Sequence, residues 1–595
     1  MQMTTVQEGS RSRLGVTSQK YQITVGTATI CSVERARADR ARLIDHLTLL
    51  LIWCVAVVLV DPRGDFPLND DWVYGKAVQT FIEHGILRLP GYAAAPIVSQ
   101  VIWGALFCKI FGFSFTVLRA STLASASIGT AVLYEILSFC RLPRRLALAG
   151  ALTLLLNPVF FALSFSFMTD VPFLVFGLCG IWFILRTLDG GGKRSLAAAL
   201  FFISAATLCR QVGLALALAF AAAYITRYGL RRRTLLDAAL IVFVPIAALA
   251  GFEAILKATT GLPRYYLSKE AELWEQFRTR NWLELFFSPR QNTGSLLRRG
   301  FTALIYVGLF LVPVSAGLMP KESRPKATFM RWAVICLIAG LGSLGLLSAK
   351  RAMPILGDGG NILINWGLGP QSLRDAELDL PNVPAAPAAF WLAVTALSSL
   401  GACLLALLSL EPLKALFARR DRFKDAVLVF SAVGAMTYFV PMGIAGFYDR
   451  YLLLLLPLTI LFIGAGSRAP LGAARPCMTY GCLIGFGLYA VAGTHDYLAW
   501  NRCRWNALRL LTERMGVPPE RIDGGKEFNG WYMYDDAYRP LKAKSSYWVQ
   551  DDEYVISFRV LAGYRPISEL SFDRWLPPGK GEIYVLRRCN AVPDT

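Results

Sequence analysis

Two adjacent aspartates follow the first long apolar segment of the chain. Residues 43–60 are mostly apolar, and "FPLNDDWVYG" at 66–75 then places Asp70 and Asp71 side by side. A carboxylate at the water edge of a membrane can act as a general base that removes a proton from an attacking hydroxyl. The pair also suits an ordinary helix start, because acids in a first turn are favoured by the helix dipole. The sequence alone leaves both interpretations open.

Three further charged residues accompany apolar segments. Asp170 lies in "SFSFMTDVPF", Arg210 in "LCRQVG" and Arg450 in "GFYDRYLLLLLP". Each has a structural alternative, because Asp before Val-Pro starts helices well and Arg can snorkel to a membrane boundary. Together with Asp70, they suit a lipid-linked phosphate substrate. Guanidinium groups hold a phosphate, while a carboxylate takes a proton from the attacking group.

Two aromatic residues stand next to the acid pair. Trp72 and Tyr74 could pack against a sugar ring. The alternative is that they belong to the aromatic belt at the membrane interface.

The composition indicates a membrane protein. The chain is 55% hydrophobic and only 17% charged, and apolar runs near twenty residues recur through most of its length. We therefore predict a polytopic α-helical protein. The net charge of +20 reflects Lys and Arg in short loops, so no nucleic-acid partner is expected. Three His in the whole chain make a His-built metal site improbable.

About thirteen spans are predicted. They cover 43–60, 118–139, 145–166, 171–188, 195–209, 211–226, 234–257, 300–319, 329–349, 388–410, 425–444, 450–467 and 476–493. The segment 95–116 carries Gln100 and Lys109, and we expect it to lie at the interface rather than to span.

The loop charges predict the orientation. With the N-terminus in the cytoplasm, every loop on the cytoplasmic side is basic, as the positive-inside rule requires. These loops are 141–145, 186–194, 227–233, 320–326, 418–424 and the stretch with Arg468 and Arg475. Asp70, Asp170 and Asp449 are then extracytoplasmic, and an odd number of spans places the C-terminus on the same side.

Three domains are expected. Residues 1–42 are predicted to be a disordered cytoplasmic tail, 43–493 a transmembrane domain with an outer loop at 61–117, and 494–595 a small extracytoplasmic α/β domain. In the last domain, "EYVISFRV" and "GEIYVLRR" are typical of strands. Cys503 and Cys589 could form a disulfide in an oxidising compartment or remain separate thiols.

These motifs resemble those of the GT-C membrane glycosyltransferases of the family 39 type, which include protein O-mannosyltransferases, the aminoarabinose transferase of lipid A and RgtA/B/C/D-like enzymes. "NDDWVYGKAVQ" resembles the acidic first-loop motif, "SFSFMTDVPFLVFGL" the second acidic motif and "YDRYLLLLLP" a late Arg-Tyr-Leu segment. The similarity covers about 43–470, and "MGVPPERIDGGKEFNGWY" resembles the end of bacterial members. A Lys-Pro-Pro-Leu-like turn of some relatives is reduced to Pro96 here.

The resemblance implies an inverting transfer from a polyprenyl-phosphate sugar to a lipid, glycan or protein hydroxyl at the outer face of a bacterial cytoplasmic membrane. It implies that Asp70 is the general base, that Asp71 positions the acceptor or Asp70, and that Asp170 supports them. Arg210 and Arg450 would hold the donor phosphate. The acids could bind a divalent metal, although no further ligands are evident. No cofactor is firmly expected.

A transporter or flippase is the competing interpretation, since charges in broken helices also suit transport. The absence of a repeat at half length and the C-terminal domain favour the enzyme. A scaffold or lipid-binding protein would not need the acids.

Overall fold

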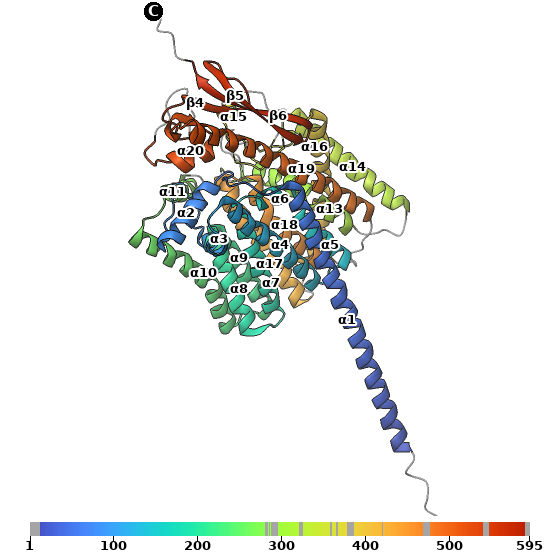
Figure 1. Cartoon of the computed structure of the whole chain (residues 1–595). Helices are drawn as coiled ribbons and strands as arrows, with labels where there is room; N and C mark the ends of the chain where they lie inside the picture. The colour runs from blue at the N-terminus through green and yellow to red at the C-terminus, as the bar shows by residue number, and fades with distance from the viewer. Residues whose placement is uncertain are drawn as a thin grey trace, which may run out of the picture. The chain divides into compact units, whose positions relative to one another are not determined.

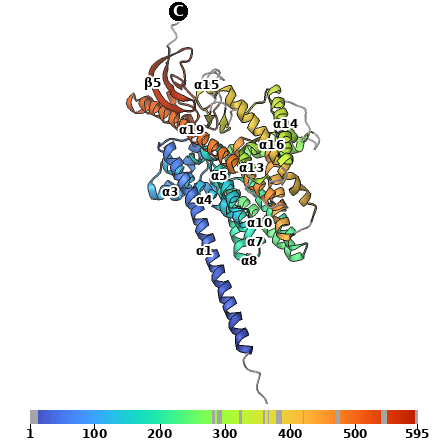
Figure 2. The same cartoon turned by 90° about the vertical axis from the view of Figure 1, so that its right-hand side faces the viewer.

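The computed structural model describes residues 12–279, 284, 286, 295–319, 325–356, 360–364, 367–377, 386–418, 421–467, 476–538 and 547–589. The chain forms two compact units, Met1–Val55 and Ala56–Thr595. Figures 1 and 2 show the helices and strands in two views.

Helix α1 (Ser12–Val60) begins much earlier than the predicted first span. The expectation of a disordered tail over 1–42 is therefore wrong from Ser12 onward. The stretch "ERARADRAR" at 34–42 explains part of this, because Ala, Arg and Glu are strong helix formers. Residues 1–11 lie outside the described part of the chain.

The predicted number of spans is confirmed. In the described part of the chain, twelve helices are long and apolar enough to cross a membrane, and the bent pair α5 and α6 makes a thirteenth. The spans are α1, α4 (Phe115–Phe139), α5 (Arg144–Leu155) with α6 (Pro158–Ser164), α7 (Asp170–Leu188), α8 (Gly192–Cys209), α9 (Leu214–Tyr228), α10 (Arg232–Thr259), α13 (Leu296–Leu318), α14 (Pro325–Ser348), α16 (Ala388–Ala415), α17 (Arg422–Ala445), α18 (Leu455–Gly466) and α19 (Pro476–Arg509). Each predicted segment corresponds to one of them.

Two breaks occur along these helices, one between α5 and α6 and one between α8 and α9. Helices α5 and α6 meet at 59°, where Asn157 caps α6 by accepting from the amides of Val159 and Phe160. Helix α8 ends at Cys209, Arg210 is extended at φ −148° and ψ 131°, and the short turn η1 (Gln211–Gly213) leads into α9. The predicted spans 195–209 and 211–226 are thus separated at Arg210, whose extended backbone ends one helix and leads into the turn before the next.

Short elements connect several of the spans. They are α2 (Asp71–His84), α3 (Val98–Phe111), α11 (Arg264–Thr279), α15 (Arg374–Glu377), the paired strands β1 (Leu363–Ile364) and β2 (Gly367–Leu368), and the turn η2 (Asp449–Leu454). Helix α3 is the segment expected not to span. Its 14 residues extend about 21 Å, which is less than the roughly 30 Å of a bilayer core.

The C-terminal part is a small sheet with one helix. After α19 come η3 (Leu510–Arg514), η4 (Pro519–Arg521), β3 (Ile522–Asp523), α20 (Lys526–Met533), β4 (Tyr554–Ser557), β5 (Tyr564–Trp575) and β6 (Pro578–Arg588). The strand order is β3-β4-β6-β5, with β3 parallel to β4 and the other pairs antiparallel. Helix α19 packs against β5, as Figure 1 shows.

Two expectations about this part need correction. The predicted boundary at 493 falls inside α19, because no Gly or Pro interrupts residues 494–509. Strand β5 was not predicted, since its sequence is largely polar and its side chains are mostly exposed.

Of the two alternatives for Cys503 and Cys589, the structure has separate thiols. Cys503 and Cys589 are both free thiols, the first buried and the second exposed. Cys503 and Phe572 line the same small cavity, and Phe572 pairs with Gly581 in the sheet. From Gly581 to Cys589 the strand extends roughly 26 Å, whereas a disulfide needs Cα atoms within about 7 Å.

Candidate active site

A cavity of about 760 Å³ is formed where separate parts of the chain meet. Its lining comes from the first outer loop, the start of α7, the turn between α8 and α9, residues 360–372, η2 and the first turn of α20. Its volume is typical of a small-molecule site. The predicted site residues that line it are Asp70, Tyr74, Asp170, Arg210 and Arg450; Asp71 and Trp72 do not.

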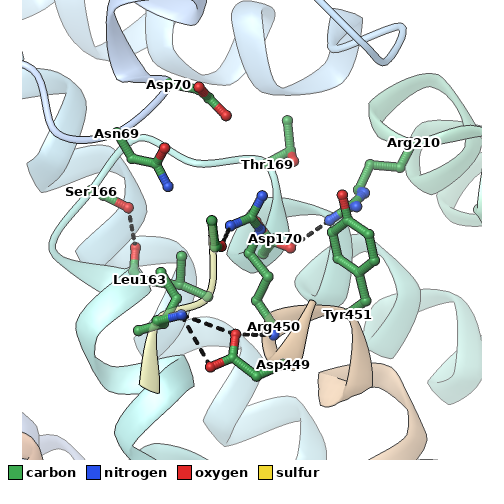
Figure 3. Close-up of polar contacts among 12 residues, drawn as sticks. Asn69, Asp70, Leu163, Ser166, Thr169, Asp170, Arg210, Asp449, Arg450 and Tyr451 are labelled. Atoms are coloured by element: carbon green, nitrogen blue, oxygen red, sulfur yellow. Dashed lines mark hydrogen bonds and ion pairs between the residues drawn. The ribbon is translucent and has the colours of Figure 1, made fainter. Parts of the chain in front are cut away.

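Asp170 joins the two arginines, as Figure 3 shows. Arg210 donates from Nη1 to Oδ1 of Asp170, and Nε of Arg450 lies 3.6 Å from the other carboxylate oxygen. The Arg210 and Arg450 guanidinium groups lie 4.2 and 5.4 Å from the centre of the Tyr451 ring. Two guanidinium groups share one carboxylate, so the cluster carries one excess positive charge and suits an anionic ligand.

The segment before β1 holds Arg450 in place. Arg450 donates from Nη1 to the carbonyl of Gly360, and Asp449 accepts from the amides of Ile362 at 3.0 Å and Leu363 at 2.6 Å. Gly360 has φ +101°, and a Cβ there would lie 3.1 Å from the Tyr448 ring. Asp449 is 1% exposed, so its role is to fix this backbone.

Asp70 faces the cavity with a lysine from the C-terminal part. Lys526 Nζ lies 2.7 Å from Oδ1 of Asp70, and the two side chains are 15% and 19% exposed. Burial raises the pKa of Asp70, but the Lys526 ammonium and the Arg450 guanidinium together outweigh it and hold the pKa below its usual range. Asp70 is therefore ionised at neutral pH, as a general base must be.

Asp71 turns away from the cavity. Its carboxylate accepts from the amide of Phe167 at 2.8 Å and from that of Leu68 at 3.2 Å. Burial raises the pKa of Asp71 to about 7, against the opposing effect of these hydrogen bonds. The predicted contact with an acceptor is not available to this residue, because it ties the first outer loop to the segment before α7. The other role expected for Asp71, the positioning of Asp70, stays a prediction.

Arg119 at the start of α4 organises the same loop. It is 1% exposed and donates to the carbonyls of Phe165 at 2.7 Å, Gly64 at 3.1 Å and Phe66 at 3.1 Å. It also donates to the carbonyl of Pro62 at 2.5 Å. This buried cation fixes the backbone that leads to Asp70.

Glu527, next to Lys526, connects the outer loop with α19. It accepts from Arg504 Nη2 at 2.8 Å, from the amide of Asn69 at 3.0 Å and from the hydroxyl of Ser372. Arg504 and Glu527 are 0% and 1% exposed. This pair fixes α20 against the loop that carries Asp70.

The two predicted aromatic residues have different places. Tyr74 lines the cavity, whereas Trp72 is fully buried. The Trp72 ring lies 5.6 Å from that of Tyr92 and 5.3 Å from those of Tyr534 and Trp548. The predicted sugar contact of Trp72 is therefore replaced by a packing role, because the sequence places it on the face of α2 that turns toward α20.

Several lining residues were not predicted. Lys526, Glu527, Tyr92, Tyr448 and Tyr451 all line the cavity. Only the stretch "GGKEF" carried a signal, through its place in a segment that resembles the end of bacterial relatives. Polar residues in loops form no local sequence pattern that would show which of them meet in one cavity.

Each carboxylate of the cavity has a cationic partner. Asp70 faces Lys526, and Glu527 faces Arg504, while Asp170 has two guanidinium partners. In the described part of the chain, no three His, Cys, Asp or Glu side chains form a ligand cluster. Divalent metals in oxygen sites take several ligands, and metal binding by these acids stays a prediction.

Comparison with known proteins gives one family match. Residues 94–256 match the family described as dolichyl-phosphate-mannose-protein mannosyltransferase. This segment includes α3 to α10, with Asp170 and Arg210. Over these residues the chain is similar to a glycosyltransferase family, which confirms the predicted resemblance to membrane glycosyltransferases. Comparison with curated protein sequences gives no match.

Three solved structures are similar over parts of their length. ArnT from Cupriavidus metallidurans bound to undecaprenyl phosphate is 15% identical, with 82% of this chain and 84% of that chain covered and a TM-score of 0.37. The apo Archaeoglobus fulgidus oligosaccharyltransferase is 17% identical, with 79% and 58% covered and a TM-score of 0.40. The S. cerevisiae Pmt1-Pmt2 complex bound to the sugar donor is 14% identical, with 35% and 32% covered and a TM-score of 0.28. The chain thus spans about a third of the length of the last protein.

Proposed function

We propose that the protein is an inverting glycosyltransferase that moves a hexosyl or pentosyl group from a polyprenyl-phosphate donor to a hydroxyl of a lipid, glycan or protein. The observation that carries this proposal is the joint presence of the Asp70–Lys526 pair and the Arg210–Asp170–Arg450 cluster in one cavity. This arrangement supports a base and an anion site in the same cavity.

The residues would act as follows. Arg210 and Arg450 hold the donor phosphate. Asp70 takes the proton of the acceptor hydroxyl while its oxygen attacks the anomeric carbon, and the electron pair of the broken bond goes to the phosphate oxygen. The leaving phosphate is a stable anion and needs no general acid. Positioned general-base catalysis contributes roughly 10²- to 10⁴-fold, and Tyr74 would contact the sugar.

The loop charges support the location. Short basic loops on one side and long or acidic loops on the other suit an N-terminus in the cytoplasm and a site at the outer face of a bacterial inner membrane. The C-terminal sheet is then extracytoplasmic, and membrane lipids surround the spans.

The test uses the full chain in proteoliposomes. Radiolabelled polyprenyl-phosphate mannose and polyprenyl-phosphate aminoarabinose serve as donors, and a total extract of envelope lipids and glycans serves as acceptor. We expect transfer of label with one donor and its loss in Asp70→Asn. Asp61→Asn is the matched control, because Asp61 lies in the same loop but pairs with Arg63 and does not line the cavity.

Two results would contradict the proposal. One is full transfer by Asp70→Asn. The other is movement of intact donor across the bilayer without any transfer by the unmodified protein, which would indicate a flippase.

A further inference from the structure

Lys526 is held at the cavity by the backbone before it. Gly525 has φ +87°, and a Cβ there would lie 2.6 Å from the carbonyl oxygen of Ser372. The close approach allows the amide of Lys526 to donate to that same carbonyl at 3.0 Å. Lys526 thus begins α20 at a fixed point of the cavity wall.

The surroundings of its ammonium group are mostly polar and anionic. Besides Asp70 at 2.7 Å, Nζ lies 3.4 Å from Oδ1 of Asn69 and 5.6 Å from the centre of the Tyr92 ring. Asn69 is 5% exposed. An ammonium group that turns away from Asp70 therefore remains close to one other acceptor, Oδ1 of Asn69, and to the Tyr92 ring.

The charges of the lining favour one added negative charge. The cations of the described lining are Lys526, Arg210 and Arg450, and its carboxylates are Asp70, Asp170 and Glu527. The charge of Glu527 is neutralised by Arg504, which does not line the cavity. The remaining three cations and two carboxylates leave an excess of one positive charge, which matches the single negative charge of a phosphodiester donor.

The transfer reaction changes where these charges lie. The acceptor proton goes to Asp70 and neutralises it, while the phosphate gains a second negative charge as the bond to the sugar breaks. The total charge of the cavity is unchanged. Lys526 loses its partner at the moment when the phosphate needs another cation.

We propose that Lys526 is a counter-ion that changes partner during catalysis, holding Asp70 ionised before the transfer and stabilising the leaving phosphate after it. This inference rests on the proposed function. It gives the C-terminal part of the chain a direct contact with the reacting groups, rather than a role only in stability.

The electrostatics of Asp70 agree with this assignment. Burial raises its pKa and the Lys526 ammonium lowers it, with a net lowering. The ionisable groups around Asp70 are Lys526 on α20, Arg450 on η2, Asp71 and Tyr74 on α2, Tyr92 in the following loop and Tyr265 on α11. Of the cations, Lys526 has the larger effect on Asp70.

The first experiment measures the pH dependence of kcat/KM for full-length protein in proteoliposomes. In Lys526→Met, the acid limb should move to higher pH by roughly one unit or more, the usual effect of an opposite charge at this distance. Lys526→Arg should keep the limb near its original place. Lys76→Met is the matched control, because Lys76 joins α2 to α20 through the carbonyl of Gly530 at 3.2 Å without lining the cavity.

The second experiment tests the change of partner of Lys526. It measures the affinity of the protein for undecaprenyl phosphate, which is the probe for the leaving group. Asp70→Asn imitates the protonated base and frees Lys526, so we expect roughly tenfold tighter binding than in the unmodified protein, as for one charge-assisted hydrogen bond. In the Lys526→Met background, the same change should give a clearly smaller gain. This binding measurement can be made even if Lys526→Met has too little activity for a pH profile.

The outcomes separate the two proposals. If the unmodified protein transfers no sugar, the proposed function fails. If it transfers sugar but the acid limb of Lys526→Met is unchanged, or the gain from Asp70→Asn is equal in both backgrounds, only the role of Lys526 is overturned.

Discussion

The buried pair of Glu527 and Arg504 gives the sharpest test of how the cavity is assembled. In Glu527→Gln, the side chain becomes neutral and its amide nitrogen cannot accept hydrogen bonds. Arg504 is 0% exposed and would keep its charge without a carboxylate partner. The amide of Asn69 or the hydroxyl of Ser372 would also lose an acceptor.

The loss of stability expected in Glu527→Gln follows from the burial of this ion pair. Removal of one partner of a buried ion pair destabilises the surrounding structure by about 3–5 kcal/mol. The matched control is Asp551→Asn, which removes an ion pair with Arg588 in the same part of the chain, where both side chains are 44% exposed. An exposed pair contributes about 0–1 kcal/mol.

Hydrogen exchange of the full-length protein in detergent measures both effects locally. In Glu527→Gln, amides of α20 and of residues 68–71 should exchange faster by a factor of roughly 100 to 5,000, since 1.4 kcal/mol corresponds to tenfold. In Asp551→Asn, the same amides should change less than about tenfold. Equal exchange in the two variants would show that the pair does not fix α20 to the outer loop.

Three further predictions concern single residues. Asp70→Asn should lower kcat by about 10²- to 10⁴-fold with an unchanged yield of folded protein, whereas Asp71→Asn should lower the yield, since it loses a backbone hydrogen bond; size-exclusion chromatography and transfer assays separate these effects. Arg450→Lys should raise KM for the donor more than it lowers kcat, because Lys cannot form a bidentate contact; an unchanged KM would contradict the phosphate role. Gly525→Ala should impair transfer through a clash with a carbonyl 2.6 Å away, whereas Gly563→Ala, with a similar positive φ but no atom within 4 Å, should not.

Much of the architecture was accessible from the sequence. A span needs about twenty apolar residues wherever it lies, so hydropathy predicts the helices one by one. The same local logic predicted that charged residues at the ends of spans would gather, and Asp70, Asp170, Arg210 and Arg450 do line one cavity. It also predicted two of the strands of the C-terminal sheet.

The sequence by itself therefore determined the helical membrane architecture and the residues at the ends of its spans, because each depends on a short window of the chain. Only the tertiary structure decided that Asp71 turns inward, that Trp72 is buried and that Lys526 reaches Asp70 from 456 positions away. These facts depend on which segments pack together and on the direction of each side chain. Neighbouring aspartates look equivalent in a sequence, but on a helix start they point about 100° apart, so packing assigns one to the cavity and the other to the backbone.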